Sequence, residues 1–198
     1  MPVVAVTGNL CSGKSTVLDI LKKKGGRVFS ADDAIHRYYK NKQCQVYKEV
    51  KNSFPSACDK KGNIIRKRLG CIFFAYYKKL KRLEEIVHPH VAKDVRKWVK
   101  SKQEGEGLYL AEIPLLFEKK LDRIFDRVIL VYSPQSILVE RIKRKFGLSK
   151  KESLKRLKLF SPLIEKKKRS HFIIANNSDL LKLKRKVGLI WRDLKRKR

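Results

Sequence analysis

The chain has 198 residues, of which 50 are lysine or arginine and 19 are aspartate or glutamate, so its formal net charge is +31. Hydrophobic residues make up 42% of the sequence, which excludes a disordered chain and suffices for the core of one α/β domain. No apolar run approaches the roughly 20 residues that cross a bilayer, and the first residues do not resemble a signal peptide, so we expect a cytoplasmic protein with no membrane partner.

The first predicted element is a short buried strand at residues 3–6, which leads into a glycine-rich loop and a helix. The loop fits the pattern G-x-x-x-x-G-K-[ST] from Gly8 to Ser15. Glycine at both ends lets the backbone approach a ligand closely, and successive N–H groups then form a nest for phosphate oxygens at the helix N-terminus. Lys14 reaches the β- and γ-phosphates, and the Ser15 hydroxyl ligates Mg²⁺.

This loop predicts a site for ATP, with Mg²⁺ as its metal. We expect its ATP-binding residues to be Gly8, Cys11, Ser12, Gly13, Lys14, Ser15 and Thr16. The alternative is a glycine-rich turn that happens to precede Lys-Ser, and it is disfavoured because the strand, loop and helix patterns all agree.

Strands and helices alternate along the rest of the chain. The helix that begins at Lys14 is expected to end at Gly25-Gly26, and a polar, mostly helical stretch reaches about residue 100 with a break at His88-Pro89. Further strands are predicted at 28–29, 108–111, 128–132 and 172–175, and further helices after Pro134, from the capping box at 149–152, and from 178–179 through Trp191. This alternation predicts an α/β fold with a mostly parallel five-stranded sheet and helices on both faces.

Two aspartates, Asp32 and Asp33, follow the second predicted strand. Ligands of an open parallel sheet lie beyond the carboxyl ends of the strands, so we expect these carboxylates at the same edge as Lys14. Phosphoryl transfer to an alcohol requires positioning, charge neutralisation and a carboxylate that accepts the hydroxyl proton. Asp32 suits the role of general base, and a helix N-cap is the alternative interpretation of the same residue.

The four cysteines, Cys11, Cys44, Cys58 and Cys71, form no C-x-x-C pair and no zinc-binding spacing, which indicates free thiols in a reducing compartment. Cys11 lies in the phosphate-binding loop near a helix N-terminus, where thiol pKa values fall. One hypothesis is that alkylation or oxidation of Cys11 blocks nucleotide binding. The alternative is that a small residue simply fits at this position.

The positive charges occur in short runs throughout the chain, among them residues 22–24, 166–169 and 195–198. A field of this sign attracts nucleic acid and other polyanions. Charge that is spread along the chain is more typical of a solvated surface than of a binding groove, and no nucleic-acid motif is recognisable. We therefore expect no specific nucleic-acid partner, and a basic nucleic-acid-binding NTPase is an alternative function.

The sequence resembles the dephospho-CoA kinases along nearly its whole length. The most specific match is the Pro-Leu-Leu-Phe-Glu signature at 114–118, and His88-Pro89 and the triplet Ser30-Ala31-Asp32 stand in register with it. Further matches lie at Arg66, Leu69, Gly70, Phe73, Leu83, Glu84, Val91, Phe125, Asp126, Arg141, Arg144, Arg156, Pro162, Glu165, Lys166, Ile174 and Asn176. Many NTPases share the phosphate-binding loop, so these additional matches carry the resemblance.

This resemblance implies a P-loop kinase that transfers the γ-phosphoryl group of ATP to the ribose 3′-hydroxyl of dephospho-CoA, the last step of coenzyme A biosynthesis. ATP and dephospho-CoA are the implied partners, Mg²⁺ is the implied metal, and we expect a monomer or small homo-oligomer. The whole chain, 1–198, is interpreted as one domain. Its core of 1–33 and 101–198 carries a helical acceptor-binding insert at about 34–100 and a lid at about 141–166.

The resemblance also implies roles for individual side chains. Asp32 is the implied general base, Lys14 and Arg141 complete the catalytic set, and Arg144 and Asn176 join the ATP-binding residues. The implied acceptor-binding residues are Asp32, Arg66, His88, Leu115, Leu116, Phe117 and Glu118. The residues themselves leave alternatives open, namely a solvated basic helix face for the two arginines, a structural role for the histidine, and core packing for the two leucines.

The chain departs from the family pattern at several positions. Asn9 and Cys11 stand where glycines are common, Ser30 replaces the first aspartate of the triplet, and Phe160 stands where glutamine is expected. Two further departures are Ile65 for an aspartate and Ser-His for Ala-Asp at 170–171. The residues expected to carry the chemistry are retained. A P-loop kinase for another small alcohol or nucleotide acceptor is the remaining alternative.

Overall fold

The computed structural model describes residues 2–75, 77–102 and 105–196, apart from the side chains of 71, 73–75 and 77. Cys71 and Phe73, both named above, therefore lie outside the described side chains. The chain divides into two compact units. Met1–Ser30 with Val99–Arg198 is called here the sheet unit, and Ala31–Trp98 is called the helical unit. Within the described residues, no helix is both long enough and apolar enough to cross a membrane.

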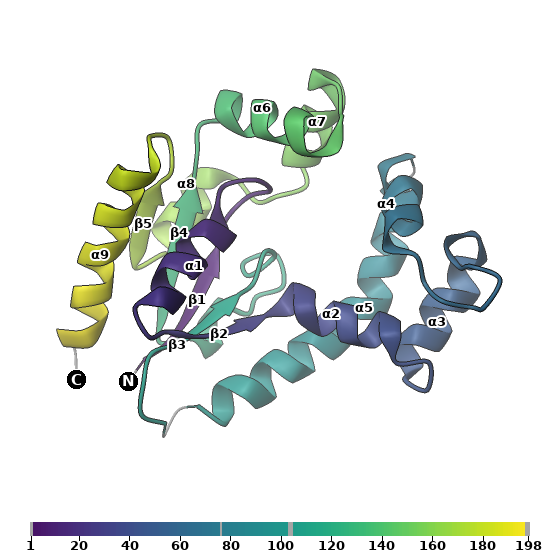
Figure 1. Ribbon diagram of the computed structural model, residues 1–198, viewed down its shortest axis with the longest axis horizontal. Helices are drawn as coiled ribbons and strands as arrows, with labels where there is room; N and C mark the ends of the chain where they lie inside the picture. Colours follow the sequence, from purple (N-terminus) through teal and green to yellow (C-terminus); the bar gives the residue numbers. More distant parts are fainter. Residues whose placement is uncertain (1, 76, 103–104, 197–198) are drawn as a thin grey trace. The chain divides into compact units, whose positions relative to one another are not determined.

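The described part of the sheet unit contains a five-stranded sheet in the order β2-β3-β1-β4-β5 (Figure 1). Its strands are β1 (Val3–Thr7), β2 (Arg27–Ser30), β3 (Tyr109–Glu112), β4 (Arg127–Tyr132) and β5 (Phe172–Ala175). All pairings between neighbouring strands are parallel, which confirms the sheet predicted from the alternation of strands and helices. The central strands are nearly continuous apolar runs because both of their faces are covered.

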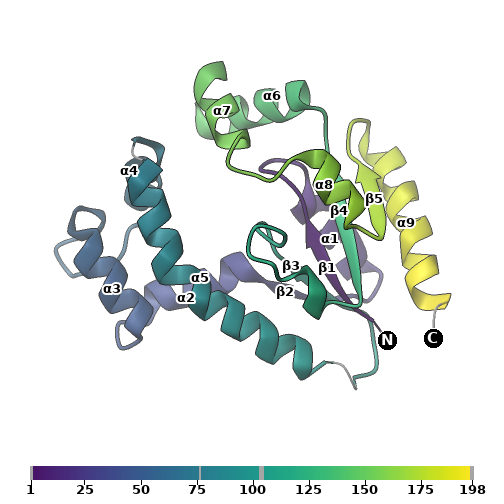
Figure 2. The same cartoon turned by 180° about the vertical axis from the view of Figure 1, so that it is seen from behind.

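Helices cover both faces of this sheet. On one face, α1 (Lys14–Lys23) and α9 (Leu180–Arg196) pack against each other, and α8 (Leu163–Lys168) lies on the opposite face, as Figure 2 shows from behind. Two further helices, α6 (Gln135–Phe146) and α7 (Lys150–Leu157), follow β4, and the short 3-10 helix η2 (Asp122–Ile124) precedes it. The capping box predicted for α7 is confirmed, because Ser149 and Glu152 bond each other's backbone N–H.

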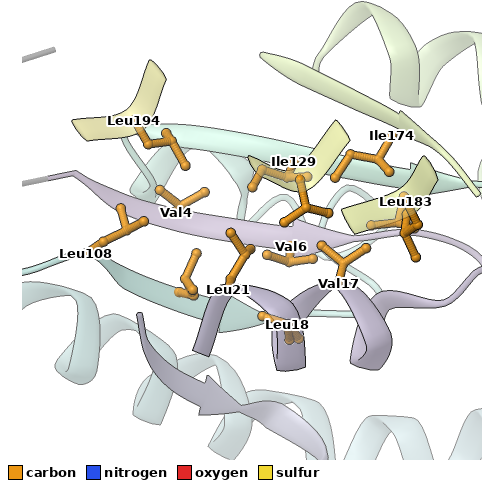
Figure 3. Packing of buried hydrophobic residues seen from close by; sticks show 13 residues of the cluster. Val4, Val6, Val17, Leu18, Leu21, Leu108, Ile129, Ile174, Leu183 and Leu194 are labelled. Carbon is orange, nitrogen blue, oxygen red and sulfur yellow. The ribbon is translucent and has the colours of Figure 1, made fainter. Parts of the chain in front are cut away.

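The core of the sheet unit lies between the sheet and the pair α1 and α9. Figure 3 shows side chains of β1 and β4 meeting those of the two helices. Val17 and Leu21 stand one turn apart on α1, so both point at the sheet, and both are fully buried. The helix α9 extends to Arg196 where we expected an end at Trp191, because Leu194 continues its buried face. Its start matches the prediction, since the Asp179 carboxylate accepts the Lys182 N–H at 2.8 Å.

The helical unit begins directly after β2. Its elements are α2 (Ala31–Lys40), α3 (Gln45–Ser53), the 3-10 helix η1 (Pro55–Ala57), α4 (Arg66–Ala75) and α5, which spans Tyr77–Lys100 and so ends just past the unit. A turn at residues 59–63 precedes α4, and in it the Asp59 carboxylate accepts the N–H groups of Lys61 and Asn63. Tyr38 of α2 donates a hydrogen bond to Asp94 of α5, which ties these two helices together.

The break expected at His88-Pro89 is wrong, because α5 continues through both residues. A proline inside a helix removes one backbone hydrogen bond and crowds the preceding turn. On α5 the apolar residues Val87, Val91 and Val95 recur every fourth position and are all buried. The packing of this continuous stripe outweighs the local cost of Pro89, so tertiary structure overrides the sequence signal.

Candidate active site

The phosphate-binding loop connects β1 to α1, and its shape dictates two glycines. Gly8 lies so close to β4 that a Cβ at this position would stand 2.1 Å from the carbonyl oxygen of Val131. Gly13 has a φ of +96°, and a Cβ there would stand 2.1 Å from Nδ2 of Asn176. Both positions therefore require glycine for reasons of backbone angle and space.

Lys14 is the first residue of α1, and its ammonium group turns back over the loop. Its Nζ donates to the carbonyl oxygens of Gly8 at 3.1 Å and Asn9 at 3.2 Å. The next residue, Ser15, is exposed in the same first turn. The positive end of the α1 dipole and the Lys14 ammonium thus stand at one loop, which is the arrangement that binds phosphate oxygens.

Cys11 lies in this loop, half-buried, with a φ of +58° that favours glycine. Burial raises the pKa of its thiol and outweighs the opposite effect of four nearby cations, Lys145, Lys14, Arg141 and Arg156. The expectation that the helix N-terminus lowers this pKa is therefore wrong, because desolvation of the thiolate is the larger effect. The same four cations make the loop electropositive, which suits a polyphosphate ligand.

Arg141 of α6 ties the loop to the carboxyl ends of β4 and β5. Its Nη1 donates to the carbonyl oxygen of Cys11 at 3.3 Å and to Oγ of Ser133 at 3.0 Å, and its Nη2 donates to the carbonyl oxygen of Asn176 at 3.1 Å. The Asn176 side chain in turn donates to the carbonyl oxygen of Ser12 at 2.9 Å. Arg141 and Asn176 therefore lie at the predicted nucleotide loop, while Arg144 is exposed further along α6.

The segment 114–118 follows β3 and is anchored at its start by Thr7, whose hydroxyl donates to the carbonyl oxygen of Pro114 at 3.4 Å. Leu116 and Phe117 are only 0% and 4% exposed. Side chains buried to this degree pack among other buried residues, which favours the core-packing alternative for Leu116. Leu115 is half-buried and keeps an accessible surface.

Glu118 ends this segment and forms an ion pair with Lys166 of α8. Its Oε1 accepts the backbone N–H of Ser161 at 2.8 Å and lies 2.9 Å from the ammonium of Lys166. Burial by itself raises the pKa of Glu118, but these two donors lower the pKa below its ordinary value. The carboxylate is therefore ionised at neutral pH and occupied by contacts within the sheet unit.

Asp32 lies in the first turn of α2 in the helical unit, one residue beyond the helix start at Ala31. This position is inside the helix, so the N-cap interpretation of Asp32 is wrong. Asp32 is exposed to a cavity of about 250 Å³, whereas the neighbouring Asp33 is not among the described residues that line it. The cavity is lined by Asp32, Ile35, His36, Tyr39, Arg66, Leu69 and Gly70.

The ionisable groups of this cavity are electrostatically linked. Arg66 Nη1 lies 3.5 Å from Nδ1 of His36. Burial and the Arg66 cation lower the pKa of His36, so its imidazole is neutral at pH 7. Burial raises the pKa of Tyr39 to about 12, which keeps its hydroxyl protonated. The cavity thus presents one carboxylate and one guanidinium beside neutral hydrogen-bonding groups.

Comparison with known proteins assigns the chain to one family. Residues 2–182 match the family model for dephospho-CoA kinase. The chain belongs to the dephospho-CoA kinase family. A dephospho-CoA kinase of Aquifex aeolicus is 36% identical over 198 residues, with 99% of each chain covered.

Solved structures agree with this family assignment. A crystal structure from Thermus thermophilus has a TM-score of 0.74 at 33% identity, with 97% of each chain covered. The dephospho-CoA kinase of Campylobacter jejuni has a TM-score of 0.69 at 26% identity, covering 97% of this chain and 96% of that one. The chain therefore has a P-loop kinase fold and is an ATP-dependent phosphotransferase of the final step of coenzyme A biosynthesis.

Within the dephospho-CoA kinase pattern, His88 is a residue that the structure does not bring to the Asp32 cavity. It lies in the middle of α5, half-buried, with Nε2 at 3.9 Å from Oε2 of Glu84. His88 is not among the described residues lining the cavity, whereas Arg66 is. His88 lies inside a continuous helix, so it caps no helix end.

The structure adds residues to which sequence reasoning gave no role. Lys145 and Arg156 act on the Cys11 thiol and so stand close to the phosphate-binding loop. Glu112 is the last residue of β3. It pairs in register with Val6, which is the residue before the last one of β1. The sequence shows that an acidic residue ends this strand. It does not show that the strand pairs with β1, which is what brings Glu112 close to the phosphate-binding loop.

Proposed function

We propose that the chain transfers the γ-phosphoryl group of ATP to the ribose 3′-hydroxyl of dephospho-CoA, with Lys14 and Arg141 at the nucleotide and Asp32 as general base. The observation that carries this proposal is the phosphate-binding loop, with its two obligatory glycines and four surrounding cations. Family membership supports the acceptor. The cytoplasm, which supplies ATP, is the proposed compartment.

The residues around the loop supply binding and charge compensation. The Lys14 ammonium, now on the carbonyl oxygens of Gly8 and Asn9, exchanges these partners for β- and γ-phosphate oxygens. Arg141 holds the loop carbonyl of Cys11 and adds positive charge beside the transferred group. Arg156 and Lys145 contribute to the same field. Phosphoryl transfer needs chiefly this positioning and electrostatic stabilisation.

Mg²⁺ fits the oxygen donors that are present at this loop. The exposed Ser15 hydroxyl would hold the ion together with phosphate oxygens of the nucleotide, and the Glu112 carboxylate is a second hard oxygen donor at the neighbouring strand end. Bound Mg²⁺ neutralises charge on the phosphates and orients them. The proposal assigns Mg²⁺ to these residues with ATP as co-substrate.

The cavity of the helical unit is the proposed acceptor site. Asp32 is exposed there and accepts the proton of the acceptor hydroxyl as the bond to phosphorus forms. The Arg66 guanidinium pairs with phosphate on the acceptor, because its planar fork matches phosphate oxygens. Ile35 and Leu69 provide apolar surface beside these charges.

Product mass after incubation with Mg-ATP and dephospho-CoA tests the proposal. We expect coenzyme A, heavier than the acceptor by one phosphoryl group, in equal amount to the ADP released. An acceptor panel that includes adenosine, a nucleoside monophosphate and shikimate should give no comparable product. ADP release without coenzyme A, or a better acceptor in the panel, would overturn the assigned substrate.

A variant of the loop shows whether the product comes from this site. We expect Lys14→Ala to lower kcat/KM on the order of 100-fold or more, because charge compensation in the transition state is lost. Lys24→Ala removes one exposed charge just after α1 and serves as the matched control, with activity within about two-fold of the parent. Equal activity of both variants would remove Lys14 from the mechanism.

A further inference from the structure

Lys166 is a charged side chain with no exposed surface. It lies on α8, and its side chain is 0% exposed, while Lys168, two residues further along the same helix, is exposed. Removing an ammonium group from water is costly unless the group is paired and hydrogen-bonded. A lysine buried to this extent therefore needs partners that are held in place around it.

Its partners come from three separate segments of the sheet unit. The Lys166 Nζ donates to Oδ1 of Asn9 at 3.0 Å and lies 2.9 Å from Oε1 of Glu118. It also stands 5.0 Å from the centre of the Phe160 ring, a cation–π distance. One ammonium group thus joins the phosphate-binding loop, the end of segment 114–118 and the stretch before α8.

Asn9 connects this buried group to the nucleotide site. Its side chain is held by Lys166, while its backbone carbonyl accepts hydrogen bonds from Lys14 Nζ at 3.2 Å and from the Ser12 N–H at 3.2 Å. A shift of the Asn9 side chain therefore moves the carbonyl that holds Lys14. Asn9 and Phe160 are two of the positions at which this sequence departs from the family pattern, and both contact the same ammonium.

We propose that Lys166 is a positioning residue for ATP, whose buried ammonium holds the phosphate-binding loop to Glu118 through the side chain of Asn9. It acts on the nucleotide through the loop. The proposal rests on the proposed function in taking ATP as the ligand of the loop. It predicts that weakening the Lys166–Asn9 link affects ATP more than the acceptor, because the acceptor residues belong to the helical unit.

Binding of Mg-ATP without acceptor, measured by calorimetry, is the direct test. We expect Asn9→Ala, which leaves the Lys166–Glu118 pair in place, and Lys166→Met each to raise the Kd of Mg-ATP by about three-fold or more. The KM for dephospho-CoA should stay within about two-fold in both variants. Lys166→Arg should restore part of the ATP affinity, and Lys168→Met is the matched control that removes an exposed charge from the same helix.

The double variant decides whether Lys166 acts through Asn9. In the Asn9→Ala background, Lys166→Met should lose most of its effect on the Kd of Mg-ATP, because the shared link is already broken. Equal effects of Lys166→Met in both backgrounds would overturn the proposal. An unchanged Kd of Mg-ATP for Asn9→Ala would overturn it even if Lys166→Met fails to fold. A wrong acceptor assignment would appear separately, as ATP binding without coenzyme A formation, and leaves this comparison intact.

Discussion

The side-chain nitrogen of Asn176 stands 2.1 Å from the point where a Cβ on Gly13 would lie. The same nitrogen donates to the carbonyl oxygen of Ser12 at 2.9 Å. Asn176, the residue after β5, therefore occupies the space that a side chain at Gly13 would need. The same amide group forms a hydrogen bond to the loop. The end of β5 and the phosphate-binding loop therefore pack so closely that only glycine fits at position 13.

Gly13→Ala should therefore be more damaging than an ordinary glycine substitution. We expect it to lower the free energy of unfolding by about 2–3 kcal/mol, from backbone strain at positive φ together with overpacking, and to weaken ATP binding. Gly25→Ala is the matched control, because Gly25 has a φ of +100° but no atom within 4 Å of its Cβ position. Urea denaturation checks both, and equal losses would show that the Asn176 contact is unimportant.

Asp32→Asn should bind both substrates but lose turnover. The amide cannot accept the proton of the acceptor hydroxyl, so we expect kcat to fall by about 100-fold or more while the Kd of Mg-ATP stays unchanged. Asp33→Asn is the matched control on the same helix turn, and it should keep activity within about three-fold. Steady-state rates at saturating substrates check the prediction. Full activity of Asp32→Asn would remove Asp32 as the base.

The Cys11 thiol should be a slow nucleophile at neutral pH. Because its pKa is raised, its thiolate fraction at pH 7 is smaller than that of an ordinary cysteine, and its alkylation rate should still rise above pH 9. Mg-ATP should slow the reaction further by covering the loop. Peptide mass spectrometry after timed iodoacetamide treatment follows Cys11, with Cys58 as internal reference. A rate plateau below pH 8 would contradict the raised pKa.

Glu118 should contribute stability that depends on pH. Its pKa is lower in the folded state, so the contribution is complete above the ordinary glutamate pKa and is lost as pH falls through the lower folded value. At pH 7, Glu118→Gln leaves Lys166 beside a neutral partner and should lower the free energy of unfolding by about 3 kcal/mol.

Thermal unfolding at several pH values checks this expectation for Glu118. The difference in Tm between the parent and Glu118→Gln should shrink as pH falls below the ordinary glutamate pKa, because the parent carboxylate becomes protonated. Glu140→Gln is a control on an exposed ion pair with Lys143, for which we expect little change at any pH. A Tm difference that does not change with pH would show that the ionised form of Glu118 is unimportant.

Several parts of the site could be predicted from residues that are neighbours in the sequence. The strand at 3–6 and the loop from Gly8 to Ser15 were predicted at their observed positions, because fixed spacing and apolar runs carry that signal. The interruption at Pro89 was wrong, since a buried stripe on α5 outweighed a local preference. The pKa of Cys11 was predicted in the wrong direction, because burial depends on neighbours that are distant in sequence.

Local sequence was sufficient for the alternation of strands and helices, the parallel sheet and the phosphate-binding loop, because each depends on residues that are adjacent or regularly spaced. The tertiary fold was needed to show that Leu116 is core, that Asn176 limits Gly13, and that Lys166 is buried between Asn9 and Glu118. These contacts join residues separated by up to 163 positions. Their energies come from burial and geometry, which a linear pattern does not encode.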